Sequence, residues 1–379
     1  MICGLLLGAI SVDAQDMAIA PQFEDARPFH AGVGRVKLNG VWGLVDRAGR
    51  MVVLPQYEQI RPGSEGIFAV NRGEPSLWSY IDATGKPLHD SSMKEARPFF
   101  KGWAAVVPYG TEWSLIKPSG ARVAREGWTE IAGWDPPFAI VKSDGTWRVI
   151  HIGDFGFVNE VVNLSQEAAF VSEQEITSAS APLNRKFVLT SPAGQTIGQL
   201  YSPGHEPGLY LTFAMPTPHE GGVGFYPKVG AVGDGLVPVQ FDDGTWAYFH
   251  LDRQQFVWER GYEGARAFHE GLAAFQQNGL WGYINRGGEV VVTPKYTRAY
   301  DFYAGYATMR QGDERGFLQV DAGGKISEYL APQFEDVFRF QEGLAPVKID
   351  GKWGYIGDGK TPDVDLRQSP IETLIPADP

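Results

Sequence analysis

The 379-residue chain has one cysteine, no basic cluster and no apolar stretch long enough to cross a membrane. The single Cys3 excludes a disulfide framework and a cysteine-based metal site. The formal net charge is −12, so nucleic-acid phosphates would be repelled, and we predict no nucleic-acid partner. A transmembrane helix needs roughly 18 apolar residues in a row, and the chain has no such run, so we predict no transmembrane span.

Catalytic motifs are missing too. The seven histidines show no zincin spacing, no Ser or Cys lies in a nucleophile elbow, and no glycine-rich phosphate loop joins a strand to a helix. His205 and His219 lie in an irregular segment and are the pair that merits a test as ligands or catalysts, although solvated loop histidines are the favoured interpretation. We predict no catalytic residue, no metal site and no cofactor.

The first fourteen residues are apolar. Ile2–Ile10 has the length of the hydrophobic region of a signal peptide, and Val12–Ala14 resembles a small-residue cleavage site, although no basic residue precedes the run. We interpret residues 1–14 as a truncated signal peptide, with a strand or helix packed on the rest of the chain as the alternative. This interpretation predicts a periplasmic or secreted protein, and the alternative location is the cytoplasm.

Aromatic and turn-forming residues are abundant, and one aromatic position repeats. Aromatics make up 13% of the chain, with 47 glycines and 26 prolines, which indicates short strands and tight turns. An aromatic residue recurs about every 35 positions within a similar short word such as "GVWGLVD". We predict that these rings form the buried core of successive units: Trp42, Trp78, Trp113, Trp147, Phe187, Trp246, Trp281, Phe317 and Trp353.

Other words keep a fixed order around each ring. A Phe–x–x–Gly word lies upstream, a four-residue turn word lies downstream, and a β-branched run then leads to a seam such as "PQFED". The predicted turns begin with Asp or Asn and end with Gly, as type I turns do: Asp46 to Gly49, Asp82 to Gly85, Asn285 to Gly288 and Asp321 to Gly324. Each unit is therefore predicted to be a three-stranded meander, with a short fourth strand near the seam.

Two further features of the unit lead to structural predictions. The Gly after Trp is expected to let a neighbouring backbone approach closely. The carboxylate pairs Glu24–Asp25 and Glu335–Asp336 recur with the repeat, which favours a solvated seam or a cap on a turn over a glycosidase pair.

The pattern resembles the WG-repeat family of bacterial proteins. The pairs Trp42-Gly43, Trp281-Gly282 and Trp353-Gly354 carry the resemblance, which extends over about residues 21–160 and 236–357. Other residues replace the glycine in four units: Ser79, Ser114, Arg148 and Ala247. The resemblance implies a repeat protein, and it implies no shared catalytic residue.

The predicted fold is all-β, a tandem array of about nine meander units of about 35 residues. An open, solenoid-like array is favoured over a closed, propeller-like ring, although the segment 16–26 could complete an unfinished last unit and close a ring. We predict repeats over 15–160, a divergent section with a long Pro/Gly-rich loop over 161–235, further repeats over 236–357 and a flexible tail over 358–379.

Rings outside the repeated slot are the better candidates for an exposed binding face: Trp103, Trp128, Trp134, Trp258, Tyr303 and Tyr306. The favoured function is a non-enzymatic repeat protein that offers an extended surface to a protein or glycan partner. The alternative is a carbohydrate-active enzyme with its site in residues 161–235.

Overall fold

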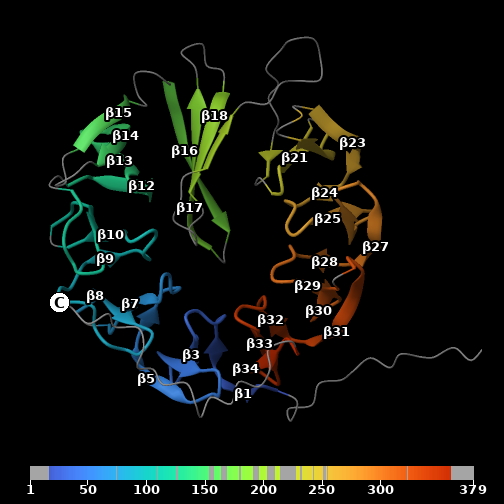
Figure 1. Ribbon diagram of the computed structural model, residues 1–379, viewed down its shortest axis with the longest axis horizontal. Helices are drawn as coiled ribbons and strands as arrows, with labels where there is room; N and C mark the ends of the chain where they lie inside the picture. Colours follow the sequence, from blue (N-terminus) through green and yellow to red (C-terminus); the bar gives the residue numbers. More distant parts are fainter. Residues whose placement is uncertain are drawn as a thin grey trace, which may run out of the picture.

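The computed structural model describes residues 17–359 except 74, 109, 125–126, 153–157, 164–168, 179–180, 191–195, 203–209, 214–227, 231–232, 242, 251–252, 254 and 322. Every regular element in these residues is a β-strand, and the strands form nine antiparallel sheets arranged around a ring (Figure 1). The predicted all-β repeat fold is therefore confirmed. No helix in this part of the chain is long and apolar enough to cross a membrane.

The first five sheets follow the chain in order. Their strands are β2 (Asp25–Ala26), β3 (Val33–Leu38), β4 (Val41–Asp46) and β5 (Met51–Tyr57); β6 (Gln59–Ile60), β7 (Ile67–Asn71) and β8 (Trp78–Asp82); β9 (Glu95–Ala96), β10 (Ala104–Val107) and β11 (Ser114–Ile116); β12 (Glu130–Asp135), β13 (Phe138–Ser143), β14 (Thr146–Ile152) and β15 (Val158–Asn163); and β16 (Ala169–Ser178), β17 (Ala181–Thr190), β18 (Thr196–Ser202) and β19 (Tyr210–Phe213). The divergent section thus has a four-stranded sheet of its own.

The other four sheets complete the ring. Their strands are β20 (Lys228–Val229), β21 (Leu236–Gln240), β22 (Trp246–His250) and β23 (Gln255–Tyr262); β24 (Gly264–Ala265), β25 (Leu272–Gln277), β26 (Leu280–Asn285) and β27 (Val290–Tyr296); β28 (Arg298–Ala299), β29 (Tyr306–Gln311), β30 (Glu314–Val320) and β31 (Ile326–Phe334); and β32 (Asp336–Val337), β33 (Leu344–Ile349), β34 (Lys352–Gly357) and β1 (Ile19–Phe23).

The sheet β24–β27 shows how the sequence builds one unit. Asn278 and Gly279 both have positive φ, 51° and 75°, so they form the mirror-image turn that suits the twist of the β25–β26 hairpin. A Cβ on Gly282 would lie 2.3 Å from the Val292 carbonyl oxygen, so glycine lets β27 pass close to β26 at a bulge. The expectation for the glycine of the Trp-Gly pair is confirmed.

The turn words have the predicted chemistry. The Asp46 carboxylate accepts hydrogen bonds from the backbone N–H groups of Ala48 and Arg50, each at 2.9 Å, and Gly49 has a φ of 76°. The same bonds and the same positive φ recur in the three other predicted turns, which begin with Asp82, Asn285 and Asp321 and place Gly85, Gly288 and Gly324 at the fourth position.

The two ends of the array meet. Strand β1 pairs antiparallel with β34, with Ile19 opposite Tyr355 and Phe23 opposite Trp353, so the N-terminal strand is the fourth strand of the last sheet (Figure 1). The preferred prediction of an open array is wrong, and the alternative of a closed ring is the one observed. Without β1 the sheet β32–β34 would keep an unpaired outer edge, which β1 covers.

The main core rings lie two residues after the tryptophan slot. Tyr80, Tyr248, Tyr283 and Tyr355 are 0% exposed. Each packs edge to face on the phenylalanine of the next Phe–x–x–Gly word, Phe99, Phe268, Phe302 and Phe29 respectively, with centroids 4.9 to 5.1 Å apart. Their hydroxyls donate to the backbone carbonyls of Arg97, Arg266, Tyr300 and Arg27 at 2.6 to 2.8 Å. Burial raises the pKa of all four tyrosines, so each remains a donor at neutral pH.

The tryptophan slot itself is less buried than predicted. Trp78 and Trp353 are 4% and 6% exposed, whereas the other described tryptophans of the slot are half-buried: Trp42, Trp113, Trp246 and Trp281. The side chains of Trp147 and Phe187 lie outside the described part.

Phe317 does not occupy the tryptophan slot. Gly316 approaches the Leu330 carbonyl just as Gly282 approaches that of Val292, so Arg315 takes the tryptophan position. Phe317 takes the core position of Tyr283 and is fully buried.

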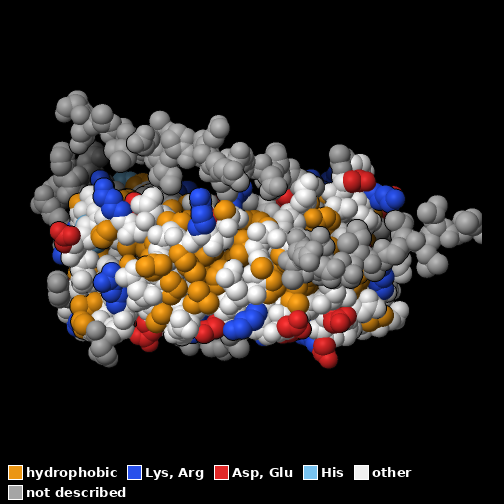
Figure 2. Space-filling model, turned by 90° about the horizontal axis from the view of Figure 1, so that it is seen from below, with side chains coloured by type: hydrophobic (Ala, Val, Ile, Leu, Met, Phe, Trp, Pro, Cys, Tyr) orange, Lys and Arg blue, Asp and Glu red, His pale blue; other side chains and the backbone are white. Residues whose placement is uncertain are grey.

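Apolar side chains also remain on the outer wall of the ring. Val52 and Leu54 of β5 are 38% and 69% exposed, and Val290 and Val291 of β27 are exposed in the same way. Figure 2, which views the ring from the side where β1 and β5 lie, shows apolar side chains gathered on this wall. Pro55 lies within β5, beside Gly43 at the bulge of the β4–β5 pair, and edge strands and bulges are where proline is tolerated in a sheet.

Candidate functional site: the hairpin face of the ring

Each sheet has two ends with different connections. In the first unit β3 leads from the turn Ala31–Gly32 to the hairpin Asn39–Gly40, and β4 returns to the turn that begins at Asp46. We call the ends that carry the hairpins and the seams the hairpin face, and the ends that carry turns such as Ala31–Gly32 the turn face. The hairpin face holds the half-buried tryptophans.

Arginine guanidinium groups lie over four tryptophans of the slot, the buried Trp78 among them. Arg61 lies 3.8 Å from the centroid of Trp78, and Arg97 lies 4.4 Å from that of Trp113. Arg27 and Arg266 stand over Trp42 and Trp281 in the same way, at 5.8 and 5.5 Å. A cation over an indole face within about 6 Å is an attractive contact.

Two of these arginines also join neighbouring units. Arg61 donates from Nη1 to the Ala96 carbonyl and forms a 2.9 Å ion pair with Glu95. Arg97 donates from Nη1 to the Ile131 carbonyl at 2.7 Å. Each of these two guanidinium groups therefore lies over the tryptophan of its own unit and binds the seam of the next one.

The series continues across the ring closure. Arg27 of the first unit lies 4.8 Å from the centroid of Phe338 of the last unit, and Phe338 stacks on Trp353 with centroids 5.2 Å apart. The hairpin face consequently carries a nearly regular row of cationic and aromatic groups, with the closure as one of its steps.

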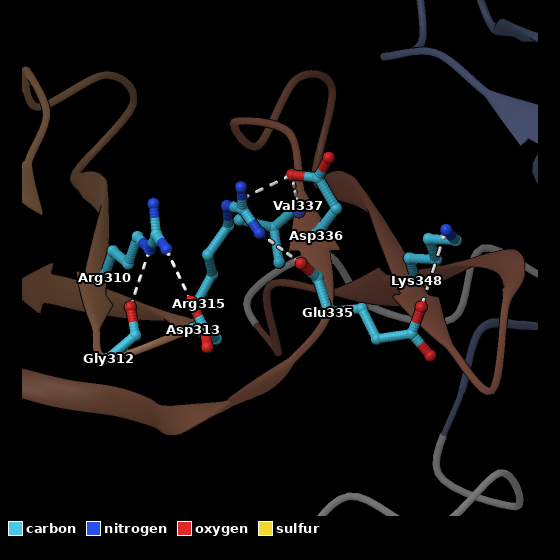
Figure 3. Close-up of polar contacts among 8 residues, drawn as sticks. All are labelled: Arg310, Gly312, Asp313, Arg315, Glu335, Asp336, Val337 and Lys348. Carbon is cyan, nitrogen blue, oxygen red and sulfur yellow. Dashed lines mark hydrogen bonds and ion pairs between the residues drawn. The ribbon is translucent and has the colours of Figure 1, made fainter.

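At one unit of the row, where Arg315 takes the place of the tryptophan, the contacts are purely polar (Figure 3). Arg315, in the tryptophan position, donates to the Glu335 carbonyl and lies 3.2 Å from the Asp336 carboxylate. Lys348 lies 3.5 Å from the Glu335 carboxylate. In the neighbouring hairpin Arg310 binds Asp313 at 2.8 Å and the Gly312 carbonyl at 2.7 Å. These charges are mutually paired.

The recurrent seam carboxylates cap the hairpins. Glu24 accepts from the N–H groups of Asn39 and Gly40 at 3.0 and 2.9 Å, and Glu335 accepts from Gly351 at 2.8 Å. Asp25, beside Glu24, forms a 2.7 Å ion pair with Arg27. The interpretation of these carboxylates as caps on turns is confirmed, and it leaves them without a catalytic assignment.

Most of the predicted exposed rings are core residues. Trp128, Trp134 and Tyr306 are 3%, 1% and 3% exposed, so the prediction that they form a binding face is wrong. Trp128 and Trp134 fill the core beside β12–β14, and Trp103 packs against the same cluster. Tyr303 alone among the described rings of that set is well exposed, at 44%. The side chain of Trp258 lies outside the described part.

The arginines were missed by the sequence prediction, although a signal exists. Each of Arg27, Arg61, Arg97 and Arg266 precedes its tryptophan by 15 to 17 residues. "ARPF" occurs in full at Ala26–Phe29 and again at Ala96–Phe99. A cation at a nearly constant offset from a repeated indole is the pattern that a recurrent stacked pair leaves in a sequence.

Among the described residues no group of three or more His, Cys, Asp and Glu could hold a metal ion. His205 and His219 lie outside the described residues, as do residues 1–16 and 360–379.

A known family shares the repeat. The family model described as "WG containing repeat" matches residues 15–42, 42–74, 255–281, 281–314 and 330–353. No curated protein matches the chain.

Solved structures that resemble the chain include the computationally designed Ika8 protein, with a TM-score of 0.37, 12% identity and coverage of 90% of this chain and 96% of that one. BamB from Moraxella catarrhalis matches with a TM-score of 0.36 and 11% identity, and the match covers 81% of this chain and 97% of that one. Sqt1 from Saccharomyces cerevisiae matches with a TM-score of 0.34 and 11% identity, and the match covers 79% of this chain and 94% of that one. Scores and identities this low indicate nothing about activity. The five repeat matches, which cover residues 15–74, 255–314 and 330–353, and the repeated Trp-Gly bulge show that the chain carries WG-containing repeats.

Proposed function

We propose that the chain is a non-enzymatic repeat scaffold whose hairpin face binds a partner protein. The observation that carries the proposal is the pair of neighbouring steps Arg61–Trp78 and Arg97–Trp113, in which guanidinium and indole are held together at 3.8 and 4.4 Å. Arginine and tryptophan are the side chains that most often dominate protein interfaces. Here they are pre-organised, so a partner would not have to offset the cost of ordering them.

A protein partner fits this row better than a glycan. A sugar ring would need an open aromatic face, and the guanidinium group of Arg61 or Arg97 covers one face of each tryptophan. The side chain of Arg61 remains 28% exposed, so its remaining N–H donors can reach a carboxylate or a main-chain carbonyl of a partner.

The alternative of an enzyme and the location outside the cytoplasm both remain proposals. The alternative of a carbohydrate-active enzyme depends on residues 161–235, most of whose side chains lie outside the described part, so it stays a prediction. A periplasmic or secreted location is likewise a proposal, and it rests on the apolar run Ile2–Ile10.

Site-specific photocrosslinking tests the scaffold function. A benzoylphenylalanine replaces the exposed Arg72, which lies between β7 and β8 on the hairpin face, or the exposed Arg50 on the turn face as the matched control. We expect one discrete protein adduct from position 72 in cells, no such adduct from position 50, and loss of the adduct when Arg61→Gln and Arg97→Gln are added. Equal adducts at both positions, or an adduct that survives the two arginine substitutions, would contradict the proposal.

A further inference from the structure

Carboxylates link successive units on the turn face. Glu342 of the last unit accepts from the backbone N–H groups of Ala31 and Gly32 in the first unit, at 2.7 and 2.9 Å. Glu270 does the same to Ala304 and Gly305 at 2.7 and 2.8 Å.

Two further junctions follow this plan with fewer bonds. Glu65 accepts from the N–H of Gly102 at 3.0 Å, and Asp234 accepts from that of Gly271 at 2.7 Å. The receiving turn is thus a cradle of backbone donors that holds one carboxylate from the preceding unit.

One cradle lacks its carboxylate because the preceding unit has alanine. Ala304 has a φ of 52°, close to the 54° of Glu270 and the 53° of Glu342, so it holds the same place in its turn. Its side chain cannot reach the next turn, Glu342–Gly343. Within the described residues the N–H groups of Glu342 and Gly343 have no protein acceptor.

The other junction that begins with alanine is filled differently. Ala31 precedes the turn Glu65–Gly66, and there the Nε2 of His30 accepts from the Gly66 N–H at 3.2 Å. The residue equivalent to His30 before Ala304 is Tyr303, which is exposed and stacks on Arg339 instead. The turn Glu342–Gly343 of the last unit therefore receives no side-chain acceptor from the described residues of the preceding unit.

A positive charge stands near the open cradle. Arg339 is exposed, precedes Glu342 by three residues, and lies 4.4 Å from the centroid of Tyr303, next to Ala304. No described carboxylate pairs with it. The carboxylate of Glu342 is itself held by Ala31 and Gly32 and lies 3.8 Å from Arg47, so its charge is largely offset.

We propose that the turn Glu342–Gly343, together with Arg339 and Tyr303, binds a carboxylate group supplied by another molecule. The ligand is the chemical equivalent of the glutamate side chain that the neighbouring units provide themselves. An acidic side chain of a partner protein and a free small carboxylic acid are the two sources of this group. The site lies on the turn face and is independent of the partner proposed for the hairpin face.

Amide chemical shifts of the deuterated, ¹⁵N-labelled full chain test the site. We expect acetyl-Gly-Gly-Glu-Gly-Gly-amide to shift the amide signals of Glu342 and Gly343 saturably, while Gly305, whose cradle already holds Glu270, does not move. The same peptide with Gln in place of Glu should shift neither signal. Acetate distinguishes the sources: saturation by acetate at equal or lower concentration assigns the site to small acids, and tighter binding of the peptide assigns it to acidic side chains.

Substitution of Ala304 provides the complementary test. Ala304→Glu should fill the cradle from within, abolish the peptide-induced shifts and raise the midpoint of thermal unfolding, whereas Ala304→Gln should retain binding. Arg339→Gln should weaken peptide binding at least about threefold, because a charge-assisted contact is lost. The proposal is overturned if no carboxylate probe moves the two amides, or if the peptide still shifts them in Ala304→Glu.

Discussion

The hydroxyl of Tyr355 donates a 2.8 Å hydrogen bond to the backbone carbonyl of Arg27, 328 positions away in the sequence. Tyr80 makes the equivalent bond to Arg97, which lies only 17 positions away. The junction that closes the ring is therefore built like a junction between consecutive units. The stacking of Tyr355 on Phe29 and the capping of Ala31–Gly32 by Glu342 repeat the same plan.

Tyr355→Phe should destabilise the protein through the closure. The substitution leaves the half-buried Arg27 carbonyl without its 2.8 Å donor, and the expected loss is about 1 kcal/mol of unfolding free energy. Urea denaturation measures it. Tyr283→Phe removes the equivalent bond to Tyr300 within the array and is the matched control. A loss in Tyr283→Phe with none in Tyr355→Phe would mean that the closure adds no stability.

Gly354→Ala should displace the N-terminal strand. A Cβ at Gly354 would lie 2.5 Å from the Ile19 carbonyl oxygen and 2.8 Å from the Pro21 nitrogen, so β1 must move away from β34. The expected cost is about 2 kcal/mol, in the range of overpacking substitutions. Gly357→Ala, in the same strand, meets no atom within 4 Å and should change stability far less. Equal unfolding free energies for the two variants would contradict the close approach.

Glu328 should contribute to the loss of stability in acid. The hydrogen bond from Lys295 lowers the pKa of Glu328 below its ordinary value of 4.5, and Tyr296 adds a second donor. Because the folded pKa is the lower one, this stabilisation is fully present above pH 4.5 and is lost as the pH falls through the folded pKa.

Thermal unfolding midpoints of the wild type and Glu328→Gln, measured from pH 7 to pH 3, test this contribution. We expect the gap between the two proteins to shrink as the pH falls. The effect should be small, because the pair is partly exposed. A gap that stays constant over the whole range would contradict the assignment.

Arg61→Lys should be costly although it keeps the charge. Lysine loses the planar stacking on Trp78 at 3.8 Å and cannot reach both the Ala96 carbonyl and Glu95 in the same geometry. The expected loss is about 1 kcal/mol of unfolding free energy. Arg50→Lys, at an ion pair whose arginine is 67% exposed, is the control and should change little. Matching losses in the two variants would argue against a structural role for the stacked arginines.

The repeat, its turns and the close approach at glycine could be predicted because each depends on residues within one unit. Asp46 caps its turn with bonds to Ala48 and Arg50, and Gly282 is required by the bulge of the adjoining strand. Such local requirements recur in the sequence wherever the unit recurs.

Which of the aromatic rings are most deeply buried could not be predicted from the alternation of side chains along a strand alone. Trp281 and Tyr283 are two positions apart and therefore point to the same face of β26. Tyr283 is fully buried because it lies in the middle of the strand against Phe302 of the next unit, while Trp281 lies near the hairpin end. This difference arises from packing between units.

The closure of the ring could not be predicted for the same reason, because it also depends on packing between units. The match of the segment 16–26 to an unfinished last unit was visible in the sequence, but the unit length favoured an open array. Whether the ends meet depends on the angle that each inter-unit contact adds, and no single unit encodes that angle. The pairing of Ile19 with Tyr355 therefore depends on the angles at all the junctions together.

Hydrogen–deuterium exchange of Ile19–Phe23 tests the closed ring most directly, because β34 is the one strand of the described residues that pairs with β1. The closed ring predicts amides in this segment that exchange about as slowly as those of the outer strand β27, and that lose their protection in Gly354→Ala. Exchange of Ile19–Phe23 at the rate of an unstructured peptide, while β27 remains protected in the same sample, would show that the array is open.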